Sequence, residues 1–118
     1  MKRDPRAFLS DVIEAGQAIL EAVDGISFDD YGNSRLIRSS VEREFITIGE
    51  ALTQLSQRDQ VLFAEIEQAP QIIGFRNKLT HEYINISNQL VWGVIKTNLP
   101  MLVDQCRQLL HRLDRELP

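Results

Sequence analysis

The apolar residues of this 118-residue chain recur at steps of three and four, the spacing of one face of an α-helix. The most regular stripe consists of Ile37, Val41, Phe45, Ile48, Leu52 and Leu55. Two further stripes lie at 8–23 and 91–113, and no segment alternates apolar and polar residues as a half-buried strand does. The connections between these segments are short. We therefore predict one all-α domain over residues 1–118, an antiparallel bundle of four or five helices.

Residues with special backbone preferences mark the ends and contacts of the first two long helices. Asp4 is a suitable N-cap, Pro5 fits the first helical position and Gly25 is a natural stop. Residues 27–33 predict a short helical turn or a loop, so the second long helix begins at the end of that stretch. Gly49 lies inside the second helix, where glycine costs roughly 1 kcal/mol relative to alanine. It therefore predicts the close approach of another helix.

The second half of the chain contains weaker boundary signals. Residues 59–67 predict a marginal helical segment, and Pro70 begins the next helix. We expect a break at 84–86 and Ser87 as the N-cap of the last helix. Pro100 lies within the last apolar stripe and predicts a kink, because proline removes a backbone donor.

Composition limits the classes of function. The net charge of −4 and pI of about 5.1 argue against a broad basic surface for nucleic acid. RNA binding would need a local basic cluster, for which the candidates are Arg35, Arg38, Arg43, Arg76 and Lys78. No apolar run approaches the roughly 20 residues of a membrane span, and no signal-peptide segment is visible. With Cys106 as its single cysteine, the chain is expected to be cytoplasmic and to make no membrane contact.

The stretch Arg76-Asn77-Lys78-Leu79-Thr80-His81-Glu82-Tyr83 concentrates the groups that carry chemistry. Arginine binds phosphate oxygens through two parallel hydrogen bonds, and histidine both takes and gives a proton near neutral pH. On an unbroken helix Arg76 and His81 point about 140° apart. Two arrangements bring them to one phosphate: the helix deforms or frays near the motif, or two copies of the motif meet across a dimer axis.

The pattern Arg-x4-His-x-Tyr resembles the HepT-like branch of the HEPN superfamily, the toxin half of HepT/MntA-type toxin–antitoxin pairs. The resemblance extends over most of the chain. Its other signatures are the opening at 2–6, the helix signature Ile48-Gly49-Glu50-Ala51, and Val91-Trp92 with Leu99-Pro100 in the last helix. Departures are Asn85, where many relatives carry glycine, and Glu44, where a neutral polar residue is more usual.

The resemblance implies a HEPN-like helical bundle that forms a two-fold homodimer, with the paired motifs building one cleft. It implies a metal-independent endoribonuclease, without a cofactor, that cleaves RNA by attack of the 2′-hydroxyl. In this scheme His81 transfers protons, Arg76 stabilises the transition state, and Asn77 holds the imidazole or contacts the phosphate. The sequence does not select between tRNA and mRNA as the target.

The resemblance also implies regulation in a type VII toxin–antitoxin system. Tyr83 matches the tyrosine to which a minimal MntA-like nucleotidyltransferase antitoxin attaches AMP. The antitoxin would act by this modification, by covering the cleft, or by both. Lys78 with Glu82, and Glu50 with Arg43, are candidate supporting pairs around the site.

A second hypothesis stays open at this point. The chain would then be a non-catalytic subunit of a nucleotidyltransferase, and its motif would bind nucleotide or phosphate without breaking a bond. A helical adaptor without a site explains the stripes but leaves the clustered motif unexplained.

Overall fold

The computed structural model describes residues 3–81 and 86–116, and in this part of the chain all regular secondary structure is helical. The elements are α1 (Pro5–Ala22), α2 (Phe28–Asn33), α3 (Arg35–Arg58), α4 (Gln60–Ala64), α5 (Ala69–His81), α6 (Asn88–Gly93), the π-helical turn η2 (Val94–Asn98) and α7 (Leu99–Arg115). The predicted all-α fold is confirmed. None of these helices is both long enough and apolar enough to cross a membrane.

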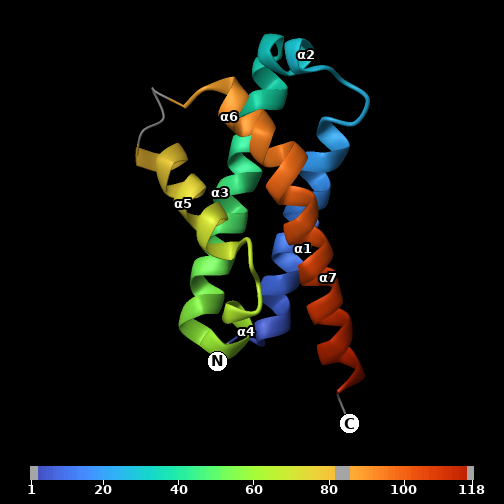
Figure 1. Cartoon of the computed structure of the whole chain (residues 1–118), viewed down its shortest axis with the longest axis vertical. Coiled ribbons are helices and arrows are strands. Elements are labelled where there is room, and N and C mark those ends of the chain that lie inside the picture. Colours follow the sequence, from blue (N-terminus) through green and yellow to red (C-terminus); the bar gives the residue numbers. More distant parts are fainter. Residues whose placement is uncertain (1–2, 82–85, 117–118) are drawn as a thin grey trace.

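Helix α3 occupies the middle of the bundle. It packs against α1 on one side and α5 on the other, and α1 also packs against α7 (Figure 1). The consecutive long helices run in opposite directions, as predicted (Figure 1). The predicted stripes supply the core: the second stripe is buried from Val41 to Leu55, and only its first member, Ile37, is partly exposed. The rings of Phe45 and Phe75 meet edge to face at 5.0 Å, which fixes α5 along α3.

Most predicted helix ends are confirmed. The side chains of Asp4, Ser34 and Ser87 each accept a hydrogen bond from a backbone N–H in the first turn of α1, α3 and α6. Ser27 caps α2 in a capping box. Of the two predictions for this stretch, a short helical turn or a loop, the helix is confirmed. Gly25 follows α1 with φ of 75°, a left-handed conformation that glycine adopts without strain.

The later boundaries agree with the sequence in part. The marginal segment is the short helix α4, and α5 begins one residue before Pro70. Of the predicted break, residues 84 and 85 lie outside the described residues, as do Glu82 and Tyr83. Ile86, which follows them, packs partly buried against the core.

Where the sequence predicts one kinked last helix, the structure has α6, the π-helical turn η2 and α7 in succession. A π-helical turn precedes Pro100, in which the backbone N–H of Leu99 bonds to the carbonyl of Val94, five residues earlier. The irregularity is therefore in the turn before the proline, and Pro100 itself lies in the first turn of α7. Ile95, inside the π turn, is still fully buried. The π turn thus accommodates the proline while the apolar stripe continues.

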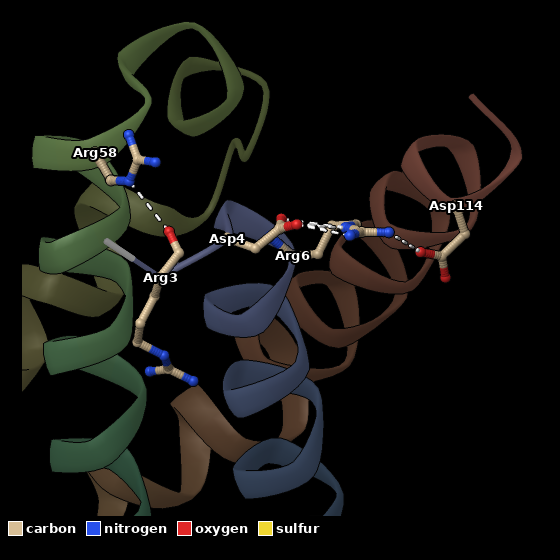
Figure 2. Close-up of polar contacts among 5 residues, drawn as sticks. All are labelled: Arg3, Asp4, Arg6, Arg58 and Asp114. Atoms are coloured by element: carbon tan, nitrogen blue, oxygen red, sulfur yellow. Dashed lines mark hydrogen bonds and ion pairs between the residues drawn. The ribbon is translucent and has the colours of Figure 1, made fainter. Parts of the chain in front are cut away.

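A polar network joins three helices at the end of the bundle where α1 begins and α7 ends (Figure 2). The Arg6 guanidinium pairs with Asp4 at 2.6 Å and with Asp114 at 3.2 Å. Arg58, at the end of α3, donates from Nε to the carbonyl of Arg3 at 3.1 Å. Hydrogen bonds from Arg6 lower the pKa of Asp4 to about 2. The opening signature of the sequence therefore joins helix ends in a structural role.

Candidate active site

Arg76 of α5 lies across α3 at Gly49. A Cβ on Gly49 would stand 2.5 Å from Cβ of Arg76, closer than real Cβ contacts come, and 3.0 Å from its Nε. The close approach predicted from a mid-helix glycine is confirmed, and the arginine of the motif makes it. Because Gly49 has no side chain, the stem of Arg76 fits against α3 at this position.

The guanidinium of Arg76 is held by a hydroxyl of α3. Nη2 of Arg76 donates to Oγ1 of Thr53 at 3.0 Å. Thr53 in turn donates to the carbonyl of Gly49, one turn earlier, at 2.8 Å. Nε of Arg76 is buried and has no hydrogen-bond partner among the described residues. The arginine is thus seated between Gly49 and Thr53 on one face of α3.

The remaining motif residues lie on other faces of α5. Asn77, Lys78 and His81 are exposed, and His81 is the last residue of the helix. Helix α5 is continuous from Arg76 to His81, so the two side chains point to different sides of it, as the sequence geometry predicts. No deformation of the helix is found between Arg76 and His81, and the part of the motif after His81, where fraying was also considered, lies outside the described residues. Within one chain the structure joins Arg76 to α3 and leaves His81 facing outward.

The candidate supporting pairs receive less support. Arg43 and Glu50 are both exposed and form no ion pair with each other. The pairing of Lys78 with Glu82 lies outside the described residues, as does any contact of Tyr83. Within the helix signature, Gly49 lies directly against Arg76.

The candidate basic residues lie on α3 and α5 and differ in how they are held. Arg38 is partly buried and donates to the carbonyl of Gly32, which ties it to α2. Arg35 and Arg43 are exposed on the first half of α3. Arg76 lies against Gly49 and Thr53, further along the same helix. Of these arginines, only Arg76 is fixed by contacts to the helix signature.

Two surface cavities flank the helices of the site. One, of about 470 Å³, lies between α5 and the α6–η2 segment and is lined by Gln71, Gly74, Phe75, Lys78, Leu90, Val94 and Asn98. The other, of about 320 Å³, lies between α1 and α3, and Glu44 contributes to its acidic wall with Asp11 and Glu14. Within 3–81 and 86–116, no three His, Cys, Asp or Glu side chains are grouped to hold a metal ion. The unusual Glu44 thus belongs to an acidic hollow on the α1 side of α3.

Sequence reasoning missed Thr53. Its position was available as a signal, because Thr53 follows Gly49 by four residues and therefore lies on the same face of the helix. When another helix packs closely against a glycine, a hydroxyl one turn away is well placed to form a hydrogen bond with a side chain of that helix. The identity of the entering group, Arg76, required the packing of α5 on α3.

Comparisons with known proteins agree with the family resemblance. The family described as "Ribonuclease HepT-like" matches residues 12–109. A Methanocaldococcus jannaschii protein named "Putative RNase" is 31% identical over 101 residues, covering 86% of this chain and 92% of the relative. A Caldanaerobacter subterraneus protein with the same name is 27% identical, covering 93% of this chain and 97% of the relative.

A third relative carries the family name itself. The "Probable ribonuclease HepT" of Thermococcus cleftensis is 28% identical over 109 residues, covering 92% of this chain and 98% of the relative. No solved structure matches the chain. The family match spans α3 and α5, the two helices that seat Arg76. The chain therefore belongs to the HepT-like ribonuclease family.

Proposed function

We propose that this protein is a metal-independent endoribonuclease and the cytoplasmic toxin of a toxin–antitoxin pair. The observation that carries the proposal is the seating of Arg76 by Gly49 and Thr53, while His81 faces outward from the end of the same helix. A fixed cation and an accessible proton-transfer group are suited to phosphodiester cleavage without a metal. The family membership of the chain points to RNA as the phosphodiester.

The active site is completed by a second copy of the chain. Because α5 is unbroken from Arg76 to His81, one chain presents the two groups about 140° apart. A two-fold axis near the exposed face of α5 brings the His81 side chains of both copies to one cleft. The homodimer is thus the arrangement that lets guanidinium and imidazole reach a single phosphate.

RNA supplies the nucleophile, the 2′-hydroxyl next to the scissile phosphate. One His81 takes the proton of this hydroxyl as its oxygen attacks phosphorus, and the partner's His81 protonates the leaving 5′-oxygen. Arg76 stabilises the additional negative charge of the transition state, and Asn77, one turn before His81, orients the imidazole or contacts the phosphate. The products carry a 2′,3′-cyclic phosphate and a 5′-hydroxyl.

Tyr83 is the control point in this proposal. A cognate minimal nucleotidyltransferase of the MntA type transfers AMP to its hydroxyl. The added phosphodiester places a negative charge beside the motif and competes with the substrate phosphate for Arg76. The modification would therefore silence the toxin without unfolding it.

The chemistry is tested with a short RNA that contains one cleavage site. Replacing the 2′-hydroxyl at that site by hydrogen should abolish cleavage, and unmodified RNA should yield a 2′,3′-cyclic phosphate in the presence of EDTA. Cleavage of the 2′-deoxy substrate at the same position would contradict the mechanism. Tight binding of RNA without cleavage would instead support a non-catalytic, phosphate-binding subunit.

A further inference from the structure

We propose that Thr53 is the positioning residue that holds Arg76 in place for the RNA phosphate, an inference that rests on the proposed function. Thr53 is partly buried on α3 and bonds to the guanidinium at 3.0 Å. It belongs to neither the motif of α5 nor the helix signature at 48–51. The hydroxyl nevertheless sets where the guanidinium can lie.

The hydrogen bonds around Thr53 have a defined direction. Its Oγ1 hydrogen points to the carbonyl of Gly49, at 2.8 Å, because a carbonyl only accepts. The lone pairs of Oγ1 are then available to accept from Nη2 of Arg76, which only donates. The two hydrogen bonds, from Arg76 to Thr53 and from Thr53 to Gly49, allow only one position of the hydroxyl proton. Together they orient the guanidinium relative to the axis of α3.

Because the Thr53 hydroxyl is neutral, the positive charge of Arg76 remains available to attract the RNA phosphate. None of the ion pairs among the described residues includes Arg76. A carboxylate in the place of Thr53 would fix the guanidinium equally well and would cancel much of its attraction for a phosphate. Thr53 positions the arginine without that loss, which suits a residue that must bind a dianionic transition state.

The two contacts act together. Gly49 admits the stem of Arg76, and its Nε is buried against α3. Thr53 then holds the end of the side chain. Without the hydroxyl, the guanidinium loses its hydrogen-bond partner among the described residues and its orientation is no longer fixed. Pre-positioned charge is worth more in a transition state than charge that must first be ordered.

The anchoring is measured first without any activity assay. In protein labelled with ¹⁵N-arginine, the Nη2 group of Arg76, which donates to Thr53, should give its own signal with slowed rotation about its C–N bond, assigned by its loss in Arg76→Lys. The rotation should become fast in Thr53→Val and stay slow in Thr53→Ser. Unchanged rotation in Thr53→Val would overturn the anchoring.

The effect on cleavage is measured with the same variants and a short RNA substrate. Thr53→Val should lower kcat/KM about tenfold, mainly through kcat, because the interaction serves the transition state. Thr53→Ser should restore most of the activity. Thr47→Val is the matched control, since Thr47 makes the same bond to a carbonyl one turn earlier on α3, at 3.2 Å to Arg43, and the Arg76 guanidinium bonds to Thr53 instead.

The outcomes separate this inference from the proposed function. Wild-type cleavage together with a Thr53→Val rate equal to that of Thr47→Val would overturn the positioning role and leave the ribonuclease intact. Absence of wild-type cleavage would overturn the ribonuclease, and the rotation of the Nη2 group would still decide whether Thr53 holds Arg76. Thermal unfolding of both valine variants shows whether a rate loss reflects loss of fold.

Discussion

Gly49 of α3 and Arg76 of α5 lie so close together that a side chain at position 49 would displace Arg76. The Cβ of an alanine at position 49 would fall 2.5 Å from Cβ of Arg76, an atom that no change of rotamer can move. The mid-helix glycine and the motif arginine are therefore one structural unit. This unit links a packing requirement of the bundle to the group that we propose binds the RNA phosphate.

Gly49→Ala should force α5 away from α3 and misplace Arg76. We expect a loss of about 1–3 kcal/mol in the free energy of unfolding, as in other overpacked helix contacts, and a loss of RNA cleavage. Urea denaturation measures the first effect. Gly74→Ala is the matched control, because a Cβ at Gly74 meets nothing within 4 Å and alanine favours the helix. Equal stability of the two variants would show that the contact with Arg76 is not restrictive.

Gly16→Ala should test the contact between α1 and α7 in the same way, far from the motif. A Cβ there would overlap Cγ2 of Val103, so we expect destabilisation of about 1–3 kcal/mol. Val103→Ala alone leaves a cavity and also destabilises. The double variant should be more stable than the sum of the two losses predicts, because alanine at 103 makes room for alanine at 16. Strict additivity in urea denaturation would contradict this packing.

The polar network at the start of α1 and the end of α7 should make the stability of the fold depend on pH in the acidic range. Hydrogen bonds from Arg6 lower the pKa of Asp4 from 3.8 to about 2. A carboxylate with a lowered pKa stabilises the folded state fully above its unfolded pKa, and that contribution is lost as the pH falls through the folded pKa. The difference in melting temperature between wild type and Arg6→Gln should therefore be constant from pH 7 to about 5 and shrink between about pH 4 and 2. A difference that does not change with pH would contradict the linkage.

Cys106 should be inert in the folded protein. Burial raises the pKa of its thiol to about 12, so almost no thiolate exists at pH 8. Iodoacetamide should label the native protein only slowly and the urea-unfolded protein rapidly, as followed by intact mass. Rapid labelling of the native protein would show that the core between α7 and its neighbours opens readily.

Dimers that combine one wild-type chain with one His81→Ala chain should be nearly inactive, because we propose that both imidazoles serve one cleft. Such dimers are purified through two different affinity tags, with a doubly tagged wild-type dimer as the control. Their RNA cleavage rate should lie close to that of the His81→Ala homodimer. Half of the wild-type rate would show that each chain carries its own complete site.

The sequence was sufficient for most of the fold because the determining signals are local. Steps of three and four define the stripes that bury Val12, Phe45 and Leu102, and short-range capping fixes the helix starts at Asp4 and Ser87. The π turn before Pro100 was not predictable from the proline alone. A proline removes one donor, which does not by itself select the π turn that the structure shows with Ile95 buried in the core.

The candidate site was predictable only in the part that a single helix determines. Gly49 predicted the close approach of another helix, and the spacing of Arg76 and His81 predicted that their side chains point in different directions. The role of Thr53 depends on which residue of α5 reaches α3, and 23 residues separate Thr53 from Arg76. Likewise, the pair of Arg6 with Asp114 joins residues 108 apart. Contacts of this length come from packing, which the periodicity of one segment does not specify.

The central claim is tested most directly by the cleavage of total RNA in EDTA, with purified wild type beside Arg76→Ala, His81→Ala and the control Thr47→Val. Intact mass establishes beforehand that the wild-type chain carries no adduct. The proposed mechanism predicts cleavage by wild type and Thr47→Val and none by the other two variants. Undiminished cleavage by His81→Ala, or no cleavage by unmodified wild type, would contradict it.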